Sequence, residues 1–210
     1  MKTGADLLVP ERAAGVVLFA HGSGSSRHSP RNKYVAAQLR EARLGTLLID
    51  LLTPQEDEVY RTRFDIGLLT ERLAEAARSL AREPQTRSLP IGLFGASTGA
   101  AAALEVAAAM PEAIRAVVSR GGRPDLASRA ALRKVKAATL LIVGGDDTGV
   151  IELNEQAYAE LGCEKKLEIV PGATHLFEEP GKLEAVARLA AQWFTRHLAG
   201  APAPSKGATR

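Results

Sequence analysis

The stretch that decides the fold is GASTG at residues 95–99, which lies between an apolar run at residues 89–94 and a helical pattern that begins at Thr98. A glycine two residues before and two residues after a serine, in a turn that joins a strand to a helix, is the pattern of a nucleophile elbow. Such a turn strains the serine backbone, and a Cβ on either glycine would collide with a neighbouring strand or helix. The alternative is an ordinary glycine-rich turn in which the Ser97 hydroxyl caps the helix. The flanking strand and helix favour the elbow.

Short apolar runs alternate with helical patterns on both sides of this turn. The other predicted strands are residues 16–20, 46–51, 116–118, 139–143 and 167–170, with an additional edge strand in residues 4–10. The predicted helices are residues 31–42, 66–82, 98–110, 124–133, 150–161 and 181–198. Runs that are apolar throughout are typical of strands covered on both faces. The fold class is therefore α/β: a mostly parallel central sheet flanked by helices on both faces, with a single domain over residues 1–198 and a flexible tail over residues 199–210.

The composition excludes several other classes of protein. The chain has 210 residues, 46% hydrophobic and 24% charged, which is typical of a globular domain. The single cysteine, Cys163, excludes an intrachain disulfide and a cysteine-based zinc site. No apolar run approaches the ~20 residues of a membrane helix, and residues 13–20 lack the flanks of a signal peptide, so we expect a cytoplasmic protein with no membrane partner. The net charge of +3 comes from interspersed charges, which argues against a nucleic-acid partner.

Distinctive loops follow four of the predicted strands, at the edge of the sheet where ligands bind in such folds. One is the turn at residues 95–99, and the second is HGSGSS at residues 21–26. Its backbone N–H groups suit either the oxyanion of a hydrolase or a bound phosphate. The dinucleotide and P-loop fingerprints are both incomplete here, because Arg27 replaces a glycine and no G-K-[ST] ending follows. We interpret His21 as a residue that organises the turn rather than as a catalyst.

The remaining two loops supply an acid and a base. GGDDTGV at residues 144–150 contains two aspartates, and PGATHLF at residues 171–177 contains His175. An aspartate or histidine alone in such a turn is ordinary turn chemistry. Together with Ser97, however, these residues follow the chain order Ser, Asp, His, which distinguishes one class of serine enzyme from the others.

These four motifs resemble those of the α/β-hydrolase superfamily over residues ~5–198, and within it those of the small proteins related to dienelactone hydrolase. The resemblance implies Ser97 as nucleophile, His175 as base and an aspartate as the acid that orients the base. The acid loop of the family commonly reads G-x-x-D-x-x-V, which favours Asp147 over Asp146. Dienelactone hydrolase itself uses a cysteine nucleophile. The serine in this chain therefore argues against dienelactone as substrate and favours a general serine esterase.

The implied reaction is cleavage of an ester, lactone or thioester of a small substrate through an acyl-enzyme on Ser97. The backbone N–H groups of Thr98 and Ser23 would form the oxyanion hole, with Gly22 and Gly24 beside the substrate. Neither a metal nor an organic cofactor is needed. The alternatives are an acyltransferase or haloperoxidase-like enzyme with the same triad, or a non-catalytic binding protein on this fold.

Two further features bear on the substrate. About 20 residues separate the predicted strands at 116–118 and 139–143, too few for a cap domain, so we expect an open, shallow site. Arg120 and Arg123 follow the first of these strands, and the two glycines between them allow a tight turn that would bring a guanidinium near the acyl pocket. Four other arginines belong to the same edge: Arg27, Arg31, Arg61 and Arg63. We therefore predict a preference for substrates that carry a carboxylate or phosphate near the scissile bond. The oligomeric state is left open, a homodimer included.

Overall fold

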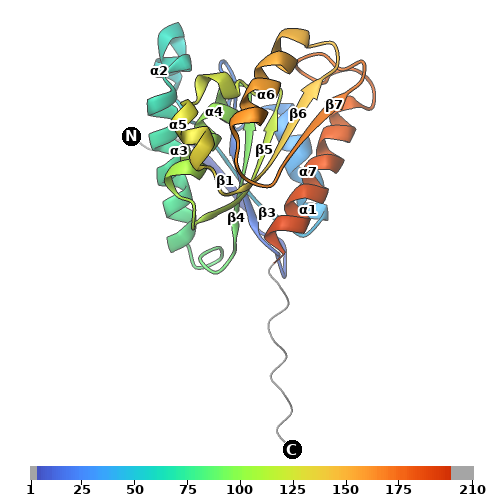
Figure 1. Cartoon of the computed structure of the whole chain (residues 1–210). Helices are drawn as coiled ribbons and strands as arrows, with labels where there is room; N and C mark the ends of the chain where they lie inside the picture. Colours follow the sequence, from blue (N-terminus) through green and yellow to red (C-terminus); the bar gives the residue numbers. More distant parts are fainter. Residues whose placement is uncertain (1–3, 200–210) are drawn as a thin grey trace, which may run out of the picture.

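The computed structural model describes residues 4–199, which form a seven-stranded sheet with helices on both faces (Figure 1). The strands are β1 (Ala5–Leu8), β2 (Val16–Ala20), β3 (Gly45–Ile49), β4 (Ile91–Ala96), β5 (Ile114–Arg120), β6 (Ala138–Gly144) and β7 (Lys165–Val170). The α-helices are α1 (Pro30–Glu41), α2 (Pro54–Glu58), α3 (Ile66–Arg82), α4 (Thr98–Ala109), α5 (Arg129–Lys134), α6 (Thr148–Glu160) and α7 (Lys182–Leu198). Two 3-10 helices, η1 (Tyr60–Phe64) and η2 (Pro124–Leu126), complete the described elements.

The sheet has the strand order β1-β3-β2-β4-β5-β6-β7. All neighbouring strands are parallel except β1, which pairs antiparallel with β3 at one edge. The predicted α/β class, the mostly parallel sheet and the edge strand near the N-terminus are thus confirmed. Because parallel strands end at the same edge, the loops that follow β2, β4, β5, β6 and β7 all lie at one end of the molecule.

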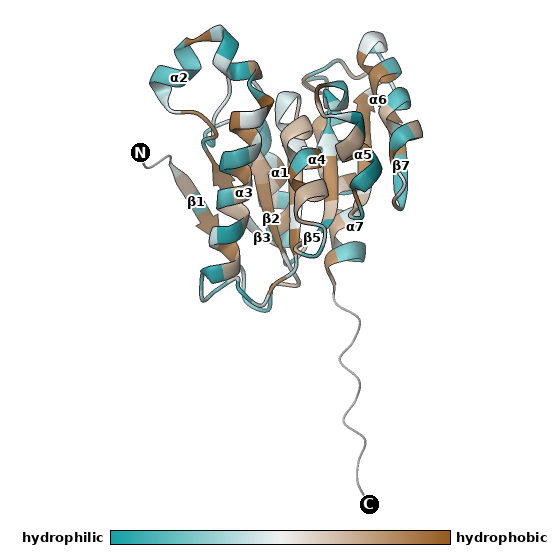
Figure 2. Ribbon diagram, turned by 60° about the vertical axis from the view of Figure 1, so that its left-hand side comes forward, coloured by the Kyte–Doolittle hydropathy of each residue, from teal (hydrophilic) through white to brown (hydrophobic). Residues whose placement is uncertain are grey.

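Alternate residues of the central strands serve two separate hydrophobic cores, as the pleat of a strand requires. In β2, Val16 and Leu18 pack with α3 and α4, whereas Val17 and Phe19 pack with α1 and α7. Figure 2 shows the apolar strands between these two helical layers, whose outer sides carry the polar residues. The sheet that carries the loops is therefore fixed from both sides.

No helix among residues 4–199 is long and apolar enough to cross a bilayer.

Helix α4 packs closely against the sheet because its first turns contain small side chains. Residues 100–103 are four consecutive alanines with no exposed surface, and α4 contacts both β4 and β5. This packing places the N-terminus of α4 directly after β4, so the turn at residues 95–99 joins two elements that are each held by the core.

The structure corrects the sequence prediction at two places. The predicted helix at residues 124–133 is split into η2 and α5, because the Ser128 side chain accepts a hydrogen bond from the Ala131 N–H and starts a new helix. Residues 54–64, for which the sequence predicts neither a strand nor a helix, contain α2 and η1. Between β5 and β6 only η2 and α5 are present, so no cap domain stands there in the described chain. The predicted tail lies outside the described residues except for Ala199.

Candidate active site

Ser97 occupies a strained turn between β4 and α4. Its backbone has φ +50° and ψ −121°, a region that costs a non-glycine residue roughly 1–3 kcal/mol. A Cβ on Gly95 would lie 2.7 Å from the Gly99 carbonyl oxygen, and one on Gly99 would lie 2.5 Å from that of His21. Both distances are too short for a real Cβ contact, so only glycine fits at either position, as the sequence predicted. The strain and the two obligatory glycines are those of a nucleophile elbow.

The Ser97 hydroxyl makes no capping hydrogen bond to α4. This observation removes the alternative in which the serine serves only to start the helix. Its side chain is half-buried and adjoins the loop after β2, where a Cβ on Gly22 would lie 3.0 Å from the Ser97 Cβ. Among residues 4–199 the hydroxyl makes no hydrogen bond to His175, and such bonds often tighten only when a substrate binds.

Asp147 and His175 come together from the loops after β6 and β7. The His175 Nδ1–H donates to Asp147 Oδ2 over 2.6 Å, which leaves Nε2 as the ring's proton acceptor. The neighbouring Asp146 is exposed, and its backbone N–H donates to the Ala173 carbonyl. A Cβ on Gly144 would lie 2.7 Å from the Thr174 carbonyl oxygen, so the two loops approach this closely only because glycine is present. The structure therefore places Asp147, and not Asp146, against the imidazole.

The loop after β5 links Ser97 to His175. The Ser97 N–H donates to the Arg120 carbonyl over 3.3 Å, and the Arg123 N–H donates to the Ser97 carbonyl over 3.1 Å. Gly121, at φ +50°, lies against His175: a Cβ on Gly121 would lie 3.0 Å from the His175 carbonyl oxygen. The backbone of this loop therefore contacts both the serine and the histidine.

Asn154 of α6 holds the same loop and was not identified from the sequence. Its fully buried Nδ2 donates to the Gly122 carbonyl over 3.0 Å and to the Val150 carbonyl over 2.8 Å. A single asparagine within a helical pattern gives no sequence signal, since its partner lies 32 residues earlier in the chain. It connects the helix that follows Asp147 to the loop that holds Ser97.

The loop after β2 is organised by His21, as predicted. Its ring is 4% exposed; Nδ1–H donates to the Gly22 carbonyl and Nε2 accepts from the Leu51 N–H, each over 2.9 Å. Burial lowers the pKa of His21, which favours the neutral ring that these two bonds require. The N–H groups of Ser23 and Thr98 donate to no group within residues 4–199. Both are therefore available to an oxyanion.

The remaining predicted site residues have different surroundings. Gly24, at φ +66°, lies beside the Arg63 guanidinium rather than beside Ser97. The Arg123 side chain is paired with Asp125 through two hydrogen bonds of 2.8 and 2.7 Å. Arg120, in contrast, is only 6% exposed.

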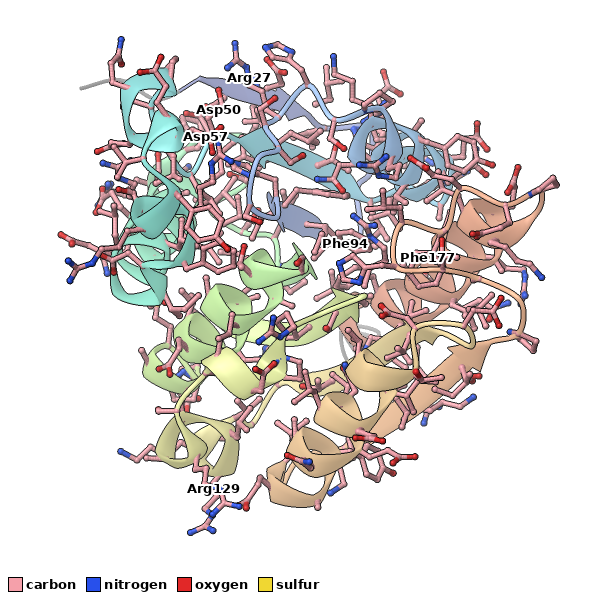
Figure 3. The ribbon with its side chains drawn as sticks, turned by 90° about the horizontal axis from the view of Figure 1, so that it is seen from above. Arg27, Asp50, Asp57, Phe94, Arg129 and Phe177 are labelled. Atoms are coloured by element: carbon pink, nitrogen blue, oxygen red, sulfur yellow. The ribbon has the colours of Figure 1, made fainter. Side chains whose placement is uncertain are left out.

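Asp50 follows the loop at residues 21–26 at the sequence separation at which dinucleotide-binding proteins have a ribose-binding acid. In this chain Asp50 is paired with Arg27. It accepts from the Arg27 backbone N–H over 2.8 Å and pairs with the Arg27 guanidinium. Figure 3, seen from above, shows both residues together near Asp57, away from Phe94 and Phe177 at the middle of the molecule. This arrangement favours an oxyanion loop over a nucleotide cradle after β2.

Comparisons with known proteins find similar sequences and similar folds. A model of the dienelactone hydrolase family matches residues 37–199. The crystal structure of a dienelactone hydrolase from Anabaena variabilis is 58% identical, with a TM-score of 0.91 over 94% of this chain and 93% of that one. The protein Est1E of Butyrivibrio proteoclasticus, solved with ferulic acid, shares the fold at a TM-score of 0.77 and 16% identity, over 94% of this chain and 96% of that one.

Two longer proteins are also similar. They come from two strains of Mycobacterium tuberculosis, are provisionally named phosphoribosyl transferases, and are each 60% identical over 200 residues. The match covers 95% of this chain but 44% of each relative. This chain therefore corresponds to a part of those proteins.

Proposed function

Since the chain belongs to the dienelactone hydrolase family and has the α/β-hydrolase fold, we propose that it is a hydrolase that cleaves an ester, lactone or thioester of a small substrate through an acyl-enzyme on Ser97. The observation that carries the proposal is the strained backbone of Ser97. A serine at φ +50° costs free energy that glycine would avoid, and its hydroxyl contributes no cap in return. Exposure of a nucleophile at the top of the sheet accounts for that cost.

The surrounding groups then have defined roles. His175 Nε2 takes the proton of the Ser97 hydroxyl as its oxygen attacks the acyl carbonyl. Asp147, 2.6 Å from Nδ1, holds the tautomer and stabilises the imidazolium. The N–H groups of Thr98 and Ser23 bind the oxyanion, and each such donor typically contributes about 10²–10³ in rate.

The acyl-enzyme forms and breaks down by proton transfers through the same base. His175 returns its proton to the leaving alcohol or thiol as the bond between acyl carbon and leaving atom breaks. It then takes a proton from a water molecule that attacks the acyl carbon, and returns it to the Ser97 oxygen as the acid departs. An acyltransferase would differ only in that an alcohol or amine replaces this water.

The name of the mycobacterial relatives supports no second proposal for this chain. That name refers to whole proteins, of which the chain spans 44%. The described loops contain no phosphate-binding fingerprint, and Asp50 is already paired with Arg27. We therefore assign to this chain the acyl-transfer chemistry of its own site.

The test is the hydrolysis of short-chain nitrophenyl esters, small lactones and acyl thioesters by the purified protein. We expect a pre-steady-state burst of nitrophenol, because an activated nitrophenyl ester acylates Ser97 faster than water releases the acid from the acyl-enzyme. The variant Ser97→Ala should lose both the burst and steady-state turnover, whereas Ser128→Ala, a serine that only caps α5, should retain both. Unchanged turnover in a folded Ser97→Ala protein would exclude the proposal. Adding alcohols as acceptors would separate hydrolysis from acyl transfer.

A further inference from the structure

Arg120 is a buried guanidinium with no anionic partner within residues 4–199. It is the last residue of β5 and is 6% exposed. Four other arginines at this end of the molecule are paired: Arg27 with Asp50, Arg31 with Glu178, Arg63 with Asp57 and Arg123 with Asp125. Arg120 has neither an ion pair nor a side-chain hydrogen bond in the described chain, and the charge that acts on it is the positive one of Arg31.

The position of Arg120 follows from the alternation of β5. Ala116 and Val118 pack on the side of α1 and α7, whereas Val117 packs on the side of α3 and α4. Arg120 therefore projects on the side of α1 and α7. Its Cζ lies 6.0 Å from the centre of the Phe177 ring, which is fully buried.

The turn that contains His175 lies close to the segments that carry Arg120 and Arg31. A Cβ on Gly121, the residue after Arg120, would lie 3.0 Å from the His175 carbonyl oxygen and 3.4 Å from its Nδ1. Arg31, in the first turn of α1, donates to Glu178 Oε1 over 2.5 Å, three residues after the histidine. Two guanidinium groups thus lie beside the turn of the proposed base, one buried and one at the rim.

A buried arginine without an anion is unfavourable. Guanidinium burial is normally compensated by a carboxylate or by a full set of hydrogen bonds. Here burial, with a smaller contribution from the charge of Arg31, lowers the pKa of Arg120 to about 10, which is still above physiological pH. The group therefore stays charged, and an anion with two or three oxygens would satisfy its planar set of donors.

Resting on the proposed hydrolase function, we propose that Arg120, with Arg31 at the rim, binds an anionic oxyacid group of the substrate, a carboxylate or a phosphate, on the α1 and α7 side of Ser97. Arg123 is excluded from this role because Asp125 already neutralises it. A purely structural role for Arg120, as a cation stacked on Phe177, is the competing explanation. The two explanations predict different results when Arg120 is replaced. Only the subsite predicts that the loss of activity depends on the charge of the substrate.

The test compares matched pairs of esters. One pair differs in the leaving group, 4-acetoxybenzoate against 4-acetoxybenzamide, and the other in the acyl group, nitrophenyl glutarate against nitrophenyl pentanoate. A further ester, 4-acetoxyphenyl phosphate, separates phosphate from carboxylate. For the wild-type protein we expect kcat/KM at least about tenfold higher for the anionic member of at least one pair, the typical effect of a hydrogen bond to a charged group.

Variants assign that preference to the subsite. Arg120→Met should abolish the preference, so that kcat/KM falls at least about tenfold further for the anionic member of the pair than for the neutral member, and Arg120→Lys should restore part of the preference. Arg129→Met is the matched control, because Arg129 is highly exposed, pairs with Glu160 and lies far from Phe177 in Figure 3. Absence of a preference in both pairs, or equal losses for charged and neutral esters in Arg120→Met, would overturn the proposal.

A binding measurement separates this proposal from the hydrolase function. Inorganic phosphate or benzoate should raise the melting temperature of the wild-type protein and of Arg129→Met, but not that of Arg120→Met. If Arg120→Met fails to fold, Arg31→Gln should still weaken the stabilisation by the anion. Stabilisation that requires Arg120 without any ester cleavage would support the subsite and remove the proposed function. Stabilisation that is unchanged in Arg120→Met and Arg31→Gln would remove the subsite.

Discussion

Two regions at the carboxyl edge of the sheet are built in opposite ways. The turn at residues 95–99 is buried, glycine-restricted and hydrogen-bonded through its backbone to the loop after β5. The segment of residues 54–64 has no buried residue in either α2 or η1, and Tyr60 is 73% exposed. It is held by side chains: Thr53 and Glu56 form a capping box, and Glu56 pairs with Arg72 over 2.6 Å.

This difference teaches where substitutions should matter. In the turn at residues 95–99, backbone atoms are in contact, so even one added methyl group has no space. In the segment at residues 54–64, half-exposed ion pairs hold short helices, and such pairs contribute ~1 kcal/mol or less each. We therefore expect large effects around Ser97 and small ones around Glu56.

The largest expected effect is on turnover, at the partner of His175. Asp147→Asn should lower kcat by about 10⁴, because the amide favours the wrong imidazole tautomer and leaves Nε2 unable to accept the serine proton. The matched control is Asp146→Asn, which removes an exposed carboxylate and should leave kcat close to wild type. Steady-state measurement of kcat with one nitrophenyl ester tests this prediction. Equal losses of kcat in the two variants would contradict the assignment of Asp147 as the acid.

The next effect is on stability, at the glycine that follows the nucleophile by two residues. Gly99→Ala should lower the free energy of unfolding by about 3 kcal/mol or more, since the new Cβ meets the carbonyl oxygens of Ala20 and His21. Gly149→Ala is the control: a Cβ there meets nothing within 4 Å. That change should be neutral or stabilise α6 by up to about 1 kcal/mol. Urea unfolding of the two variants gives both values, and similar stabilities would break the contrast.

A smaller effect should appear at Ser97 itself. Ser97→Gly should be about 1 kcal/mol more stable than Ser97→Ala, because glycine adopts φ +50° without the strain that alanine retains. Both variants lack the hydroxyl, so the difference reports the backbone alone. Denaturant melts of the two proteins measure it. Equal stability, or a more stable alanine variant, would mean that the turn stores no strain.

The smallest effects are on pH dependence. The loop at residues 21–26, which adjoins Ser97, and the segment at residues 54–64 should lose stability over different pH ranges. The Arg72 guanidinium lowers the pKa of Glu56 to about 2, so the pairing of α2 is intact above pH ~4.5 and is lost as the pH falls from there toward 2. Burial lowers the pKa of His21, so acidification below its ordinary value near 6.5 favours the unfolded state, which binds the proton. The His21 contribution therefore declines first.

Hydrogen exchange of residues 21–26 and 54–58 over pH 7 to 3, corrected for intrinsic rates, tests this order. The loop at residues 21–26 should lose protection first, and α2 only below pH ~4.5. Glu56→Gln should remove the second transition and leave the first. Loss of protection in the reverse order would contradict the assigned pKa directions.

The same contrast explains what could be predicted from the sequence. Glycines that avoid backbone collisions are visible as a motif, so the sequence predicts the elbow, the acid loop and the base loop. It also predicts Asp147 rather than Asp146 as the acid, and in the structure Asp147 is the aspartate hydrogen-bonded to His175. The helices of residues 54–64 were missed because they have no apolar stripe and depend on Arg72, which lies in the next helix. Asn154 was missed for a similar reason, since its partner is distant in the sequence.

Arg120 and Arg123 also show what local sequence cannot predict. Arg120 and Arg123 are three residues apart, and both follow the same apolar run. The structure separates them, because β5 extends to Arg120 and buries it, while Arg123 lies in the next turn beside Asp125. Local sequence does not predict the end of a strand to within one residue. Here the exact end of β5 decides which of the two guanidinium groups lacks an anionic partner among residues 4–199.

The central claim is that the strained Ser97 is the nucleophile, and covalent labelling tests it most directly. A fluorophosphonate probe, followed by peptide mass spectrometry, should place one adduct on Ser97 in the wild-type protein and in Ser128→Ala, and none in Ser97→Ala. His175→Ala should slow labelling strongly, since the hydroxyl then has no base. An adduct on another residue, or undiminished labelling of a folded Ser97→Ala protein, would contradict the claim.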